Sequence, residues 1–216
     1  ADVLRLIGAI HYERGNYAEA DPQWQRSASI FSNIGEWHKE LRVRQNLAAI
    51  AGQEGYPGKA IDTFRYILER LPPGRDPDLE ATVLQNLGAS SRNFGDIDGA
   101  LQAFSSALLL RQGAGDATHI SAALRGLGST YYLSGEYERA RTYLQQALTS
   151  ARTVGDGRSQ AAILTYLGNI AYLEGDVSGA LELHRDAEAI TNSAQGPATR
   201  RLLMAMDLAA LGPHAR

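Results

Sequence analysis

Several residues that could carry out catalysis or hold a metal ion occur in the chain, but their spacing fits neither role. The five histidines are His11, His38, His119, His184 and His214. No two of them stand three to five residues apart, and none belongs to a carboxylate pattern typical of a metal site. Ser, His and Asp residues are scattered without the turn that presents a catalytic nucleophile. We therefore expect no metal site, no cofactor and no enzymatic activity.

Two other patterns suggest phosphate binding or acid–base chemistry. The segment GYPGKA at residues 55–60 contains Gly-Lys, but a phosphate-binding loop needs Gly five residues before that Gly and Ser or Thr after the Lys. Gln53 and Ala60 occupy those two positions. The paired acids Glu136 and Glu138 flank an expected helix start, where the helix dipole accounts for them. Both patterns are better explained by a turn and a helix start.

The elements that would position any site recur every 40 residues. The pattern Gly-x-apolar-x-x-Ala begins at Gly15, Gly55, Gly95, Gly135 and Gly175. For a chain with 22 glycines in 216 residues, five glycines in one phase are expected by chance about once in 10⁵ for each phase tested. Repeats of this length bury a core only by stacking, which creates an elongated array with a shared groove. The sequence predicts one array of repeats at 1–40, 41–80, 81–120, 121–160 and 161–200.

Each repeat is predicted to be a pair of helices joined at the recurring glycine. In most repeats Leu or Ile stands at positions four and seven, followed by a small residue at position eight, so that all three share a helical stripe. That small residue and the Ala at position 20 let two helices approach closely. Bulky side chains follow four residues later at Trp24, Phe64, Phe104 and Leu144, and His184 breaks this series. The glycine ends the first helix because a left-handed backbone costs other residues about 1 kcal/mol.

The connections between repeats also recur. Acidic residues that are expected to cap the following helix stand at Glu36, Asp76, Asp116 and Asp156. In the second repeat, LPPGRDP at residues 71–77 replaces the simple turn, which predicts a stiffer connection and a shorter second helix. Residues 201–212 are predicted to form a C-terminal capping helix, because Asp207 occupies a position that is apolar in the repeats.

Composition limits the partner and the compartment. The net charge of −3 argues against direct contact with nucleic acid. No apolar run approaches the roughly 18 residues of a membrane span, and there is no cysteine, so we expect a cytoplasmic protein without membrane contact. All but two of the 21 basic residues are Arg, which hints at a GC-rich bacterial genome. A start in phase with the repeat, without Met, suggests a piece of a longer protein.

The spacing Leu-x-x-Leu-Gly, then Gly-acidic-apolar, then Ala-x-x-x-Phe resembles the tetratricopeptide repeat. It is clearest in LQNLGASSRNFGDIDGALQAF at 84–104 and LRGLGSTYYLSGEYERARTYL at 124–144. The period of 40 departs from the family's usual 34 or so. Arrays of this longer kind are similar to those of kinesin light chains, of metazoan spindle-orientation adaptors and of bacterial signal-transduction ATPases that regulate antibiotic pathways. The resemblance implies an all-α, right-handed α-solenoid of five helix hairpins with a capping helix.

The family geometry implies that first-helix positions two, five, six, nine and twelve line an inner face. This face carries four arginines, no Glu or Lys, and Asp2 as its only acid. Arg and Asn can hydrogen-bond the main chain and carboxylates of an extended peptide, and Tyr offers a rigid contact surface. The alternative is that these are solvated positions of amphipathic helices. The predicted binding residues are Arg5, Tyr12, Arg42, Gln45, Asn46, Gln85, Asn86, Arg92, Arg125, Tyr132, Asn169 and Tyr172, with Thr165 in the same row.

The leading hypothesis is a partner- or effector-sensing arm of a larger bacterial transcriptional regulator, which binds a protein or an extended peptide with acidic residues. The alternative is a stand-alone scaffold or cargo adaptor that bridges two proteins, and a third reading is an accessory segment of an enzyme. Self-association is also open, because Val3, Leu6, Ile7 and Ile10 make the first helix apolar on its outer side.

Overall fold

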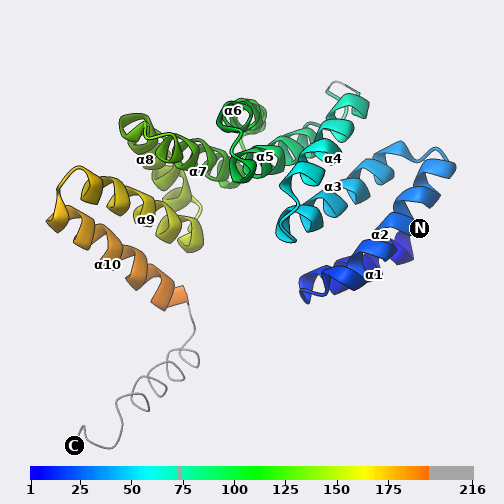
Figure 1. Ribbon diagram of the computed structural model, residues 1–216, viewed down its shortest axis with the longest axis horizontal. Coiled ribbons are helices and arrows are strands. Elements are labelled where there is room, and N and C mark those ends of the chain that lie inside the picture. Colours follow the sequence, from blue (N-terminus) through cyan, green and yellow to red (C-terminus); the bar gives the residue numbers. More distant parts are fainter. Residues whose placement is uncertain (73, 195–216) are drawn as a thin grey trace, which may run out of the picture. The chain divides into compact units, whose positions relative to one another are not determined.

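The computed structural model describes residues 1–72 and 74–194, most of which are helical; no residue in this part forms a strand. The predicted capping helix at 201–212 lies outside the described residues. The helices, shown in Figure 1, are α1 (Asp2–Glu13), α2 (Tyr17–Asn33), α3 (Trp37–Gln53), α4 (Pro57–Arg70), α5 (Pro77–Phe94), α6 (Ile97–Ala114), α7 (Ala117–Leu133), α8 (Tyr137–Thr153), α9 (Gly157–Leu173) and α10 (Val177–Ala194).

Successive helices pack as hairpins: α1 with α2, α3 with α4, α5 with α6, α7 with α8 and α9 with α10. Neighbouring hairpins also touch, because α2 packs on α3, α4 on α5 and α8 on α9. Two compact units result, an N-terminal unit of residues 1–116 with α1–α6 and a C-terminal unit that begins at residue 117 and contains α7–α10. The predicted all-α fold of consecutive helix hairpins is confirmed.

The recurring glycine ends the first helix of each hairpin as predicted. At the five positions its φ angle is 76°, 84°, 91°, 80° and 88°, all in the left-handed region. In the first hairpin the Gly15 N–H donates to the Tyr12 carbonyl at 2.9 Å, and the Asn16 N–H donates to the His11 carbonyl at 2.9 Å. These bonds satisfy carbonyls at the helix end that have no partner inside the helix.

The small residue at position eight faces the bulky residue at position 24 of the same repeat. A Cβ on Gly88 would lie 2.9 Å from the Phe104 ring, and a Cβ on Gly128 would lie 2.6 Å from Leu144 Cγ. His184 takes the equivalent place opposite Gly168, where a Cβ would lie 2.8 Å from the imidazole. The histidine that breaks the sequence pattern therefore fills the same position in the hairpin.

The predicted caps are confirmed at two positions and wrong at a third. Asp76 Oδ1 accepts from the Leu79 N–H at 3.0 Å, and Asp156 Oδ1 accepts from the Ser159 N–H at 3.1 Å. Glu36 makes no such bond, because its longer side chain carries the carboxylate past the helix end to within 3.7 Å of Lys39 Nζ. The expected shortening of α4 is confirmed: it has 14 residues, against 17 or 18 in the other second helices.

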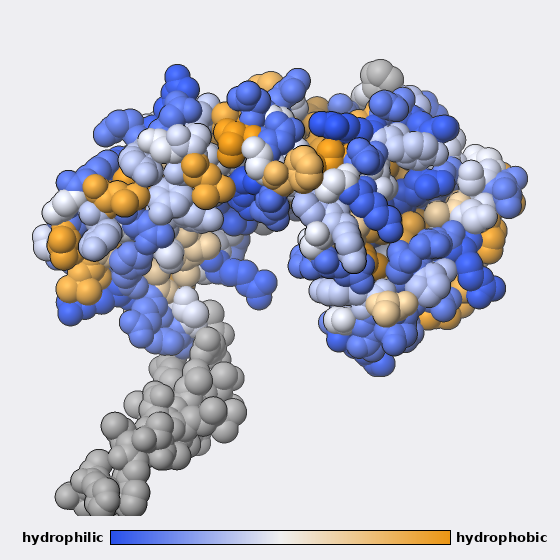
Figure 2. Space-filling view, in the orientation of Figure 1, coloured by the Kyte–Doolittle hydropathy of each residue, from blue (hydrophilic) through white to orange (hydrophobic). Residues whose placement is uncertain are grey.

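The surface in the view of Figure 2 is mainly hydrophilic, interrupted by separate apolar patches. Within residues 1–72 and 74–194, no helix combines the length and the apolar character that a membrane span requires.

Candidate partner-binding groove

The first helices of the N-terminal unit border two adjoining cavities. One, of about 460 Å³, lies between the C-terminal halves of α1, α3 and α5, and the other, of about 520 Å³, lies beside the N-terminal halves of α1 and α3. Gln45 and Asn46 line both, so we treat the two cavities together as the N-terminal groove. The predicted binding residues that line it are Arg5, Tyr12, Arg42, Gln45, Asn46 and Asn86.

The first cavity, which we call the amide end, is rich in carboxamides: Gln45, Asn46, Gln53, Asn86 and Asn93. Within the described part of the chain, none of these five side chains hydrogen-bonds to another residue of the protein. Each carboxamide offers both a donor and an acceptor, the pair of groups that a peptide main chain also presents. The fold therefore leaves this lining available to hydrogen-bond a ligand.

Small residues form the apolar part of the amide end. Ala9, Ala49 and Ala89 stand at position nine of three successive repeats and are half-buried in the lining. Buried Trp24 and Phe64 contribute from the second helices behind them. Because alanine projects only a methyl group, a peptide backbone can come close enough to reach the amides on either side.

Tyr12 is held in place at the amide end by an aromatic cluster. Its ring centroid lies 5.3 Å from that of Tyr17 and 5.5 Å from that of Trp24, and the Trp24 Nε1–H donates to the Arg5 carbonyl at 2.9 Å. Burial, with a smaller contribution from Tyr17, raises the pKa of the Tyr12 hydroxyl above its ordinary value of 10.0. Tyr12 therefore keeps its proton at neutral pH and can donate it in a hydrogen bond.

The second cavity, which we call the cationic end, is lined by Arg5, Lys39 and Arg42 and by one acid, Asp2. Arg5 Nε is 3.9 Å from Asp2 Oδ1, and Lys39 Nζ is 3.7 Å from a Glu36 carboxylate oxygen; the side chains of both pairs are about half exposed. Exposed pairs at such distances contribute little free energy and exchange easily for another carboxylate. Arg5 and Lys39 can therefore bind an acidic group of a ligand.

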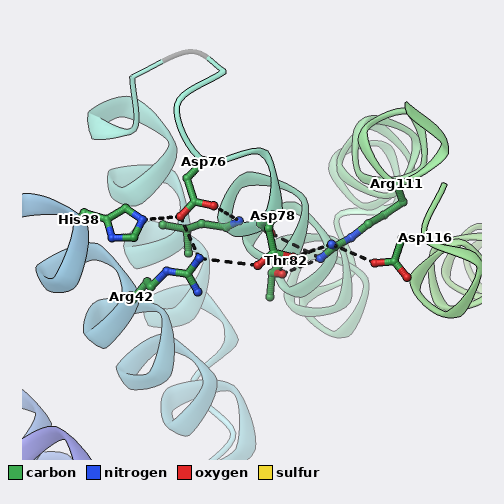
Figure 3. Close-up of polar contacts among 8 residues, drawn as sticks. His38, Arg42, Asp76, Asp78, Thr82, Arg111 and Asp116 are labelled. Carbon is green, nitrogen blue, oxygen red and sulfur yellow. Dashed lines mark hydrogen bonds and ion pairs between the residues drawn. The ribbon is translucent and has the colours of Figure 1, made fainter. Parts of the chain in front are cut away.

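Arg42 already forms an ion pair inside the protein. Its Nη2 donates to Asp76 Oδ2 at 2.9 Å, and His38 Nε2 lies 2.6 Å from the same oxygen (Figure 3). Burial would raise the pKa of Asp76, but hydrogen bonds from the Leu79 N–H, His38 and Arg42 outweigh it and lower that pKa below 3.8. Asp76 thus caps α5 and ties it to α3, and Arg42 lines the groove while serving this contact.

We expect the Asp76 contacts to weaken only in acid. Because the pKa of Asp76 is lower in the folded than in the unfolded chain, its stabilisation is complete above pH 3.8 and is lost as the pH falls through the folded-state pKa. Asp76→Asn keeps a capping oxygen but loses the charge, and it should lower the free energy of unfolding by about 1–2 kcal/mol at pH 7. Denaturant titrations at pH 7 and pH 3 check this, and a difference from wild type that does not shrink in acid would contradict it.

A buried arginine continues this network on the other side of α5. The Arg111 side chain of α6 is only 6% exposed, and its Nη1 donates to Asp78 Oδ1 at 2.7 Å and to Asp116 Oδ2 at 3.3 Å (Figure 3). Its Nη2 donates to Thr82 Oγ1 at 2.7 Å. Asp78 also lies 3.7 Å from Arg42. The network therefore joins α3, α5 and α6 behind the groove.

The remaining predicted residues lie outside the groove. Gln85 and Arg92 are half-buried on α5 and do not line either cavity. In the C-terminal unit, the Arg125 charge helps to lower the pKa of Asp156, after the larger effect of the hydrogen bonds from Ser159. Tyr132 packs against Tyr137 and Tyr166, Tyr172 is exposed and Asn169 is half-buried.

Six polar lining residues were missed by the sequence analysis, namely Glu13, His38, Lys39, Gln53, Ser90 and Asn93. Gln53 and Asn93 stand at position 13, one residue beyond the predicted row. The sequence did contain a signal for them, because each of the first three repeats has a polar residue at this position: Glu13, Gln53 or Asn93. His38 and Lys39 belong by number to the end of the first repeat but lie in the first turn of α3. A helix start placed at residue 37 would have found them.

The chain consists of successive helix hairpins, and the first helices of three of them border a polar groove. This arrangement defines a helical repeat protein. The sequence profile of the tetratricopeptide repeat family matches residues 79–153 and 120–193, and the chain belongs to this family. No curated protein matches the chain in sequence.

Solved structures support the same fold. The chain is similar to a putative kinesin light chain with tetratricopeptide-like repeats from Podosopora anserina, with a TM-score of 0.73 at 15% identity over 90% of this chain and 95% of that one. It is similar to aspartyl phosphate phosphatase F of Bacillus subtilis, with a TM-score of 0.77 at 13% identity over 90% of this chain and 51% of that one. A signal-transduction ATPase with a tetratricopeptide repeat sensor from Pyrococcus horikoshii has a TM-score of 0.72 at 18% identity, over 87% of this chain and 30% of that one.

Proposed function

We propose that the chain is a protein-interaction module whose N-terminal groove binds an extended peptide segment of a partner. The observation that carries this proposal is the row of five carboxamides without protein partners, which lies beside the exposed charges of Arg5 and Lys39. The amides bind the peptide main chain, and the alanine floor admits small or apolar side chains. An acidic residue of the peptide binds at the cationic end.

The larger context that we propose is a bacterial regulator in which this array is the sensing arm. The likeness to a signal-transduction ATPase with a repeat sensor supports this context, whereas the likeness to a putative kinesin light chain favours an adaptor that bridges two proteins. These two solved structures share only the fold with this chain. We propose that the protein is located in the cytoplasm. The full-length reading frame distinguishes the two: an adjoining phosphate-binding loop and helix-turn-helix support the regulator, and their absence supports the adaptor.

The groove is tested with peptides selected from a displayed random library on the purified chain. For a selected peptide, Asn46→Leu with Asn86→Leu should weaken binding about 30-fold, because two side chains that hydrogen-bond the main chain are lost at about 1 kcal/mol each. The matched control is Asn33→Leu, at the exposed end of α2. Fluorescence anisotropy measures the affinities. Equal affinity of the double variant and the control would contradict binding in the groove.

The same peptides test the charge of the cationic end. Arg5→Gln with Lys39→Gln removes two charges and leaves Arg42 and its contact with Asp76 intact. An acidic peptide should then bind about 10-fold more weakly and lose most of its salt dependence, because exposed charge pairs are screened by salt. A salt dependence identical to that of wild type would show that acidic residues bind elsewhere.

A further inference from the structure

The first helix exposes an apolar stripe beside the groove lining. Val3 is 68% exposed, Leu6 53%, Ile7 37% and Ile10 49%, and none of these four lines either cavity. Their spacing of three and four residues places them together on one face of α1. A contiguous apolar face of this kind is characteristic of an interaction surface.

The positions equivalent to Val3 and Ile10 are buried in other repeats, whereas the position of Leu6 carries the groove-lining Asn46 and Asn86 in the next two. Position three is fully buried at Val43, Val83 and Ile163, and position ten is buried at Ile50 and Ile170. Each of these residues lies on a first helix that is covered by the second helix of the preceding hairpin: α2 covers α3, α4 covers α5 and α8 covers α9. The face of α1 therefore has the composition of a repeat interface and lacks a covering helix among the described residues.

The interface between α2 and α3 shows which helix fits such a face. Val43 and Ile50 of α3 belong to one core cluster with Ala28 and Phe31 of α2. The alanine lets the two helices approach, and the large side chain three residues later fills the space between them. A helix that covers α1 must offer the same combination of a small and a large apolar residue.

We infer that the outer face of α1 is a docking surface for an amphipathic partner helix of this α2-like character. This inference is independent of the proposed function, because the groove and the outer face of α1 share no residue. The surface continues the series of interfaces already formed by α3, α5 and α9. The partner helix takes the place of the second helix of a preceding repeat, and its apolar face carries a small residue and a large apolar residue spaced by three.

A second copy of the chain fits this face poorly. On α10 the positions equivalent to Ala28 and Phe31 are Glu188 and Thr191, both polar and exposed. Two α1 helices placed face to face would bring four large side chains against four others, with no small residue to allow close approach.

The experiment places a covering helix in front of α1, in register with the repeat. A fusion that carries a second copy of residues 17–40 in front of Ala1 places an α2-like helix before α1, as α2 precedes α3. Amide hydrogen exchange in α1, followed by mass spectrometry, should slow about 10-fold or more relative to a control fusion whose added segment carries Ala28→Glu and Phe31→Glu. Equal exchange in the two fusions would overturn the inference.

The same chain without a fusion distinguishes a partner helix from a second copy. Light scattering across a 100-fold concentration range should show a monomer, and the exchange of α1 should not depend on concentration. A dimer that Ile10→Glu dissociates would assign the face to self-association and overturn docking of a partner helix. A dimer that survives Ile10→Glu, together with slowed exchange in the fusion, would support the inference.

Discussion

Arg111→Ala should lower the free energy of unfolding by about 3 kcal/mol, the largest effect that we expect from any charge in the chain. The side chain is buried and donates to Asp78, Asp116 and Thr82, so its removal takes three hydrogen bonds and a buried positive charge from the network. Breaking a buried ion pair from one side typically costs 3–5 kcal/mol, and the lower end applies here because Asp78 is 62% exposed. Urea unfolding followed by circular dichroism measures the change.

A matched control separates burial from charge. Arg65 also pairs across helices, with Asp96 at 4.0 Å, but both side chains are far more exposed than Arg111, at 57% and 37%. Arg65→Ala should change the free energy of unfolding by less than about 0.5 kcal/mol. Arg111→Leu refills the volume without the hydrogen bonds and should fall between the two. Equal effects of Arg111→Ala and Arg65→Ala would show that the buried network does not stabilise the N-terminal unit.

Gly88→Ala should destabilise the same unit by about 2 kcal/mol, although it adds only one methyl group. The new Cβ would lie 2.9 Å from two atoms of the Phe104 ring, which is itself 1% exposed and cannot move aside. Overpacking of this kind typically costs 1–3 kcal/mol and forces the two helices of the hairpin apart. Thermal unfolding should show the loss.

Gly113→Ala in α6 should have the opposite effect on stability. A Cβ at Gly113 meets no atom within 4 Å, and its backbone is helical with no positive φ. Replacement by Ala should therefore stabilise the unit by about 0.5–1 kcal/mol, because Ala loses less conformational freedom than Gly on entering a helix. If both substitutions moved the melting temperature in the same direction, the close contact at Gly88 would not be the cause.

The fold could be predicted because its determinants are local and repeated. A glycine in left-handed conformation, an alanine five residues later and a large side chain after that define a hairpin without reference to distant residues. The same logic explains the error at Glu36, because a repeat alignment treats Glu and Asp as equivalent. Capping depends on the length of the side chain, which the alignment ignores.

The groove was only partly predictable, because it depends on which residues share a turn of three different helices. Asn46 and Asn86 were found since they occupy the same repeat position. Arg111 was missed because its partners are 33 and 29 residues away at Asp78 and Thr82, and no repeat position predicts a buried arginine. At the equivalent position the other repeats carry Phe31, Leu71, Ala151 and Thr191. Arg42 was predicted to bind a ligand because the sequence does not show that it already forms an ion pair with Asp76.

The packing of α1 on one side only has a consequence for the affinity of the groove. Within the described residues α1 packs mainly on α2, whereas α3 packs on both α2 and α4, so that opening α1 there breaks fewer contacts than opening α3. Arg5 and Tyr12 lie on α1, so each opening of this helix removes two lining residues from the groove. Ligand binding is then coupled to the packing of α1 on α2. The apparent affinity of the groove scales with the fraction of molecules in which α1 is packed.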